Sequence, residues 1–146
     1  MKIQIVKRIV YAVLIVVWMI VVFEFSGQNG DTSQGTSDVI IDKIIEINSN
    51  LESKRDTISF CVRKLAHFSI YLIGGVLVFG FFDTFSLPKK YVFIFALIFG
   101  AVYAGSDEFH QSFVSGRSAQ VRDVCIDTCG VITGEFIQYF IKKHKK

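Results

Sequence analysis

Three groups of polar side chains interrupt otherwise apolar stretches of this sequence. Lys64, His67 and Tyr71 are three and four residues apart, so in a helix they share one face. Asp123 and Asp127 are likewise four apart. A third group occupies about one and a half helical turns and comprises Ser106, Asp107, Glu108, His110 and Gln111. Together these groups offer ammonium, imidazole and carboxylate functions, which can hold an anion, bind a metal ion or transfer protons.

The basic side chains favour an anionic ligand. Arg117, in the loop after the third group, can form a forked pair with a phosphate or carboxylate, and Lys64 adds a point charge. Proton transfer is the alternative chemistry, for which His67, Glu108 and His110 are the candidate catalytic residues. The histidines and carboxylates also suit a divalent metal ion. Because the two fixed cations would repel a metal, we expect none here, and no other cofactor.

The elements that carry these groups are predicted to be membrane-spanning helices. About 20 apolar helical residues cross the roughly 30 Å hydrocarbon core. Four segments qualify, at approximately residues 6–25, 60–82, 91–109 and 122–141, and most charges lie outside them. A single proline and three cysteines exclude a collagen-like or disulfide-stapled chain. We therefore predict an all-α integral membrane four-helix bundle, forming one domain over residues 1–146.

The distribution of Lys and Arg orients this bundle in the membrane. If both termini are cytoplasmic, the inner segments are residues 1–8, 83–90 and 142–146, which carry nine Lys and Arg. The longer outer segments, residues 26–59 and 107–123, then carry only five. This bias predicts cytoplasmic N- and C-termini. All three polar groups then converge at the outer, extracytoplasmic edge of the membrane. No basic nucleic-acid patch is present, and the C-terminal KKHKK suits an anionic lipid surface.

Residues 26–59 are predicted to form an outer loop that begins with a turn-rich, flexible stretch. Within it, the isoleucines of residues 38–47 lie largely on one helical side. This pattern indicates a short amphipathic helix, which either lies on the outer membrane surface, caps the bundle or packs on the loop alone. The first apolar segment also has the basic start of a signal peptide, but no small-residue cleavage site follows it. We therefore predict an uncleaved helix.

The motifs in these segments resemble those of the VanZ-like family. They are F-x-x-Q at residues 25–28, R-K-x-A-H-F-x-x-Y at 63–71, S-D-E-F-H-Q-x-F-V-x-G-R at 106–117 and D-V-x-x-D-x-x-G-x-x-x-G at 123–134. The resemblance extends over nearly the whole chain and implies a small four-helix bacterial membrane protein, whose namesake is associated with teicoplanin resistance. The characteristic positions that the resemblance carries over are Lys64, His67, Tyr71, Asp107, Glu108, His110, Gln111, Gly116, Arg117, Asp123 and Asp127.

These observations lead to one expected function and two alternatives. We expect a multi-pass protein of the bacterial plasma membrane that binds an anionic lipid or lipid-linked envelope precursor in the outer pocket. By the resemblance, this binding affects sensitivity to glycopeptide antibiotics of the teicoplanin type. The first alternative is a membrane enzyme that modifies a lipid head group or peptide terminus by acid–base chemistry. The second is a bundle in which the polar residues are structural ion pairs only.

Overall fold

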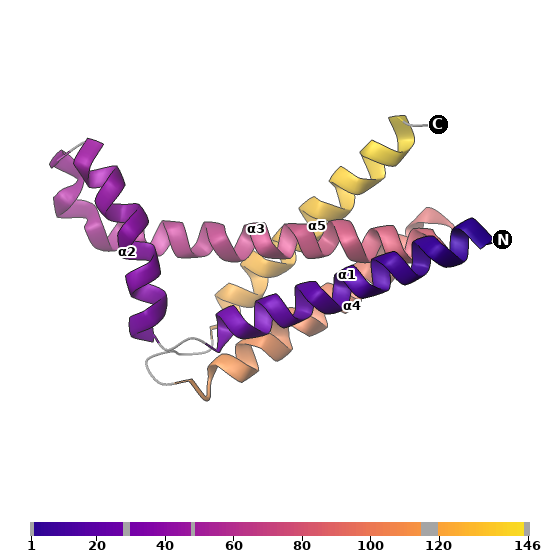
Figure 1. Cartoon of the computed structure of the whole chain (residues 1–146), viewed down its shortest axis with the longest axis horizontal. Coiled ribbons are helices and arrows are strands. Elements are labelled where there is room, and N and C mark those ends of the chain that lie inside the picture. The colour runs from indigo at the N-terminus through magenta and orange to yellow at the C-terminus, as the bar shows by residue number, and fades with distance from the viewer. Residues whose placement is uncertain (1, 28–29, 48, 115–119, 145–146) are drawn as a thin grey trace.

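Helices joined by short turns make up the residues that the computed structural model describes, which are 2–27, 30–47, 49–114 and 120–144 (Figure 1). These residues form five α-helices and one 3-10 helix, namely α1 (Lys2–Ser26), α2 (Gly30–Ile47), η1 (Ser49–Lys54), α3 (Arg55–Asp83), α4 (Lys89–Gln111) and α5 (Val121–His144). The structure thus confirms the predicted all-α class.

Four of the helices, α1, α3, α4 and α5, are long and apolar enough to cross a membrane. Their outward-facing side chains are also apolar, as at Ile98, Val102 and Phe140, of which Val102 is 67% exposed. A surface of this kind is suited to lipid rather than to water. The 29 residues of α3 span about 43 Å, so its first turns extend beyond a hydrocarbon core of roughly 30 Å.

The ends of the spanning helices alternate as a four-helix bundle requires. At one end, Arg8 of α1 donates a hydrogen bond from Nη2 to the carbonyl oxygen of Thr84, at 3.0 Å. Asp83 at the end of α3 pairs with Lys89 of α4 and, at 2.8 Å, with Lys142 of α5. The start of α1, the α3–α4 connection and the end of α5 therefore lie together. This is the end that the count of basic residues predicts to be cytoplasmic.

Helices α3 and α5 make the closest contact in the bundle, and glycines permit it. A Cβ atom on Gly134 would strike the carbonyl oxygen of Leu72, and one on Gly130 would lie 2.5 Å from that of Phe68. Gly75 of α3 faces the backbone of α5 in the same way. Small residues allow backbones to approach at this distance, as they do in other membrane helix pairs. The G-x-x-x-G motif of α5 thus packs inside the bundle.

Helix α1 packs on α3 through aromatic side chains that also fill glycine sites. The indole of Trp18 lies over Gly74, and the phenol ring of Tyr11 lies over Gly80. Trp18 Nε1 donates a hydrogen bond to the carbonyl oxygen of Ile70, at 2.8 Å. This bond satisfies the polar atom of a nearly buried indole and sets the position of α1 along α3.

Helix α2 begins earlier than the sequence pattern indicates. The stretch that we predicted to be flexible is helical from Gly30, and the helix continues through the predicted amphipathic segment to Ile47. Once the isoleucine-rich part is helical, each added residue contributes a backbone hydrogen bond without a new nucleation step. The helix packs against η1 and the start of α3, and it crosses the long axis of α3 steeply (Figure 1).

Burial of Ile41 and a cluster of ion pairs hold α2 in place. Ile41 is fully buried. Arg55, the first residue of α3, pairs with Asp42 at 2.6 Å and lies 3.8 Å from Asp38. Because these charged groups are exposed, the pairs contribute little, and the apolar contact of Ile41 dominates. Helix α2 therefore caps the outer end of α3.

The predicted orientation can be tested with single cysteines on a variant lacking the three native ones. Gly35→Cys on α2, where a side chain meets no neighbour, is expected to react with a membrane-impermeant maleimide in intact cells. Lys143→Cys, at the opposite end on an exposed position of α5, is expected to react only after lysis. Labelling of Lys143→Cys alone in intact cells would contradict the orientation.

Candidate functional site

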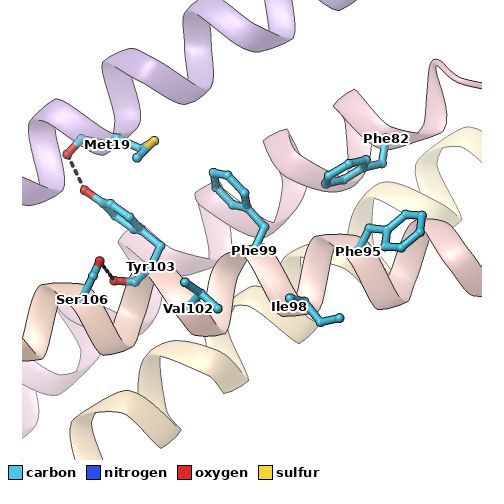
Figure 2. Close-up of a pocket in the computed structure, with 8 residues that line it drawn as sticks. All are labelled: Met19, Phe82, Phe95, Ile98, Phe99, Val102, Tyr103 and Ser106. Carbon is cyan, nitrogen blue, oxygen red and sulfur yellow. Dashed lines mark hydrogen bonds between the residues drawn. The ribbon is translucent and has the colours of Figure 1, made fainter.

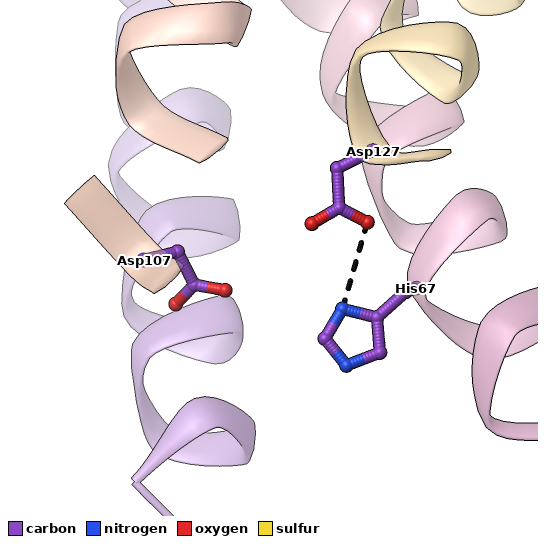
Figure 3. Close-up of side chains that lie close together, drawn as sticks. All are labelled: His67, Asp107 and Asp127. Carbon is purple, nitrogen blue, oxygen red and sulfur yellow. Dashed lines mark ion pairs between the residues drawn. The ribbon is translucent and has the colours of Figure 1, made fainter. Parts of the chain in front are cut away.

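Three helices bring a histidine and two aspartates together inside the end of the bundle that is predicted to be outer. His67 comes from α3, Asp107 from α4 and Asp127 from α5, and the three side chains point toward a common centre (Figure 3). One ligand atom of each lies within 4.8 Å of those of the other two. We call these three residues the central triad. The convergence that the helix spacing predicts is therefore present in the structure.

Asp127 is the most deeply buried member of the triad. Its side chain has no exposed surface, and neither carboxylate oxygen accepts a hydrogen bond. Its nearest charged or titratable partner is His67, whose Nδ1 lies 3.5 Å from Asp127 Oδ1. A carboxylate inside a membrane protein costs several kcal/mol unless it is paired or hydrated. This site therefore keeps an acid where packing alone would favour an apolar residue.

Lys64 lies one turn nearer the outer end and is held by a different aspartate. Its Nζ donates to Asp123 Oδ2 at 2.5 Å, and both side chains are largely buried. Arg122 is a second, more distant neighbour, with Nε 4.0 Å from Asp123 Oδ1. Lys64 and Arg122 thus lie beside Asp123, whereas His67 lies beside Asp127.

Breaking the Lys64–Asp123 pair is expected to destabilise the protein more than removing both charges. Lys64→Met leaves the Asp123 carboxylate unpaired and should lower the free energy of unfolding by about 2 kcal/mol, less than at a fully buried pair. The double variant Lys64→Met/Asp123→Leu should recover most of that loss. Thermal unfolding in one detergent compares them. Additive losses in the double variant would show that the two groups do not interact.

Two further predicted residues close the outer side of the triad. Glu108 is buried, and its Oε2 accepts a hydrogen bond from the backbone N–H of Gln120 at 2.9 Å. Its other oxygen, Oε1, has no hydrogen-bond partner. Gln111 donates from Nε2 to Asp107 Oδ2 at 3.2 Å. These bonds tie α4 to the start of α5 and orient Asp107.

Aromatic side chains form the inner wall below the triad. Tyr71 is fully buried, and its hydroxyl has no hydrogen-bond partner among the described residues. Its ring meets that of Trp18 edge-on, with the ring centroids 5.6 Å apart. The ring centroids of Tyr103 and Trp18 are 5.0 Å apart, and the Tyr103 hydroxyl donates a hydrogen bond to the carbonyl oxygen of Met19. Tyr71 was among the site residues predicted from the sequence, whereas Trp18 and Tyr103 were not. Both could have been found in the sequence as aromatic residues with a polar group that lie within apolar spans.

One predicted site residue, His110, points elsewhere, and another is not among the described residues. The His110 ring stacks on Phe23 of α1, with centroids 4.3 Å apart, so it faces away from the triad. Asp107, by contrast, faces α3 and α5, where it lies near His67 and Asp127. Arg117, together with Gly116, lies outside the described residues.

An apolar groove leads to this site along the outside of α4. It has a volume of about 620 Å³ and is lined by Met19, Phe82, Phe95, Ile98, Phe99, Val102, Tyr103 and Ser106 (Figure 2). Tyr103 belongs both to this groove and to the inner wall of the site. It lies one turn from Asp107 on the same face of α4. The groove therefore ends beside the polar cluster.

Comparison with protein families agrees with this architecture. The family model described as VanZ/LLP1 matches residues 11–142, which is nearly the whole chain. Comparison with curated proteins and with solved structures gives no match. The matched range includes α3 and α4 in full, most of α1 and α5, and every residue of the central triad. The chain is thus a multi-pass membrane protein that belongs to the VanZ/LLP1 family.

Proposed function

We propose that the protein binds an anionic lipid or lipid-linked envelope precursor at the outer edge of the bacterial plasma membrane. The observation that carries this proposal is an apolar groove that shares Tyr103 with the wall of the buried polar cluster, one helical turn from Asp107. Such a site matches an amphiphile, whose chain lies in the groove and whose head group reaches the cluster. The groove volume is within the roughly 300–1,000 Å³ typical of small-molecule sites.

The head group is expected to contact charged residues at the outer end. Lys64 is close enough to the surface to share its charge between Asp123 and an incoming phosphate. Arg117 can add a forked pair. His67, Asp107, Glu108 and the other polar side chains of the site then accept or donate hydrogen bonds to the remaining head-group atoms.

Membership of the VanZ/LLP1 family and the resemblance to VanZ-like proteins support a role in glycopeptide sensitivity. Lipid-linked precursors and phospholipids both present phosphate at this depth and on this face of the membrane. A protein that holds such a precursor changes how much of it is accessible to teicoplanin-type antibiotics, which bind its peptide terminus. The proposal thus links the pocket to antibiotic sensitivity through lipid binding.

A groove-filling substitution tests the proposal. Val102→Trp is expected to weaken retention of phosphatidylglycerol by the purified protein, measured by native mass spectrometry, because the indole occupies the groove. Ile94→Trp is the matched control, since Ile94 is exposed on the same helix but does not line the groove. Phosphatidylcholine with identical chains tests the need for net negative charge. Equal retention of both lipids by all three proteins would overturn the proposal.

The pairing of His67 with Asp127 favours an enzyme as the second candidate. A carboxylate beside an imidazole orients the ring and stabilises its protonated form, which is the arrangement of a general base. The free oxygen of Glu108 is a further proton acceptor. This candidate predicts that cells expressing the protein contain a modified lipid head group or peptide terminus, visible by mass spectrometry. If the protein binds lipid but the envelope lipids are unchanged, the enzyme candidate is excluded and the binding function stands.

A further inference from the structure

We propose that the central triad of His67, Asp107 and Asp127 binds a divalent transition-metal ion. The metal site extends the proposed function. It rests on that function only in that the ion is taken to contact the lipid head group. The ion itself is inferred from the geometry of the triad. It gives the pocket the positive charge that an anionic head group needs.

The first observation is the arrangement of potential ligand atoms. They come from three different helices and lie within 4.8 Å of one another (Figure 3). His67 Nδ1 and Asp127 Oδ1 are 3.5 Å apart. Two ligands at the usual 2.0–2.1 Å from one tetrahedral ion are about 3.3 Å apart. The pair already has nearly this spacing, and a small rotation of the side chains brings Asp107 to the same ion.

The second observation is that, within the described part of the chain, no hydrogen bond is made to the Asp127 carboxylate. This side chain is 0% exposed, points into the triad, and has two oxygens without a hydrogen-bond partner. His67 Nδ1 also lacks one. Buried polar atoms in folded proteins nearly always have partners. Where no protein group serves, a bound ion or an ordered water is a usual partner. One cation would satisfy all of these atoms together.

The charge balance of the pocket supports the same conclusion. The sequence argument against a metal depended on Lys64 and Arg117 lying beside the ligands. In the structure, Lys64 is held by Asp123, and Arg117 lies outside the described residues. Over the described part of the chain, no lysine or arginine forms an ion pair with Asp107 or Asp127. Among the described residues, the triad thus lacks a lysine or arginine countercharge.

The types of ligand indicate which ion the site takes. One imidazole nitrogen with two carboxylates suits Zn²⁺ or Mn²⁺, whereas Ca²⁺ prefers a shell made entirely of oxygen. Three protein ligands leave at least one coordination position open. The open position can accept a phosphate oxygen of the head group, and the buried hydroxyl of Tyr71 can hydrogen-bond a bound oxygen.

Metal content of the purified protein provides the test. The wild type is first treated with chelator, then incubated with Zn²⁺ or Mn²⁺ and freed of excess metal. It is expected to retain about one ion per chain, measured by inductively coupled plasma mass spectrometry. His67→Ala and Asp127→Asn should each weaken binding by more than the roughly tenfold that loss of an outer-shell partner costs. Glu135→Gln is the matched control, because it removes another buried acid of α5 outside the triad and should retain the ion.

The wild-type measurement keeps the inference falsifiable even if a variant fails to fold. Absence of bound Zn²⁺ and Mn²⁺ in the folded wild type would overturn the metal site, as would unchanged binding in folded Asp127→Asn. Retention of phosphatidylglycerol with and without chelator separates the two proposals. Equal retention in both conditions supports the lipid function and overturns the bridging ion. Metal binding without any lipid retention supports the ion and overturns the proposed function.

Discussion

Replacing Gly134 with leucine is expected to prevent the bundle from assembling. A Cβ atom at this position already meets the carbonyl oxygen of Leu72, so a larger side chain must push α5 away from α3. Because the obstacle is backbone, the loss should exceed the roughly 3 kcal/mol at the upper end of ordinary overpacking. We expect little folded protein in the membrane fraction and no monodisperse peak on size exclusion.

Gly105→Leu is the matched control for this prediction. Gly105 lies in α4, and a Cβ atom there meets nothing within 4 Å. The substitution also removes the conformational freedom of a helical glycine, so stability should be unchanged or slightly higher. Equal folding of the Gly134 and Gly105 variants would mean that α3 and α5 do not pack as described. The arrangement of the triad would then no longer hold, because α3 carries His67 and α5 carries Asp127.

Replacing Asp127 with asparagine is expected to remove function while preserving the fold. The carboxylate is buried without a hydrogen-bond donor, so in chelator the variant should unfold at the same temperature as the wild type or higher. Its affinity for phosphatidylglycerol should nevertheless fall by at least about tenfold, or about 1.4 kcal/mol. Cells expressing it should lose any change in teicoplanin sensitivity that the wild type causes.

Asp83→Asn gives the opposite pattern and serves as the control. Asp83 pairs with Lys89 and Lys142 at the other end of the bundle. Its loss should lower the unfolding temperature and leave lipid affinity and teicoplanin sensitivity as in the wild type. If Asp127→Asn instead behaves like Asp83→Asn, the triad is a structural ion-pair cluster. Comparing stability with binding thus separates the site from that alternative.

Much of the fold followed from the sequence because the membrane imposes simple rules. Apolar runs of sufficient length predict four spans, and residues spaced three or four apart predict shared faces. His67 and Asp127 could therefore be assigned to one level before any contact was known. The outer connection was harder, because the helical state of residues 30–37 depends on extension from the isoleucine-rich segment that follows.

The partners within the site could not be read from the sequence. Whether Lys64 pairs with Asp123 or Asp127 depends on their depths once α3 and α5 cross, and the glycine contacts set that crossing. His110 shares a motif with Asp107, but packing of α1 directs it toward Phe23. Both features arise from the relative rotation and translation of helices, which local spacing does not determine.

The most direct test of the account is an experimental structure of the wild-type protein in lipid nanodiscs containing phosphatidylglycerol. The account predicts density for a lipid chain along Val102 and Tyr103, with its phosphate reaching the pocket formed by His67, Asp107 and Asp127. A well-resolved pocket whose side chains pair directly with one another, with the groove filled by protein and no lipid density at either place, would contradict it.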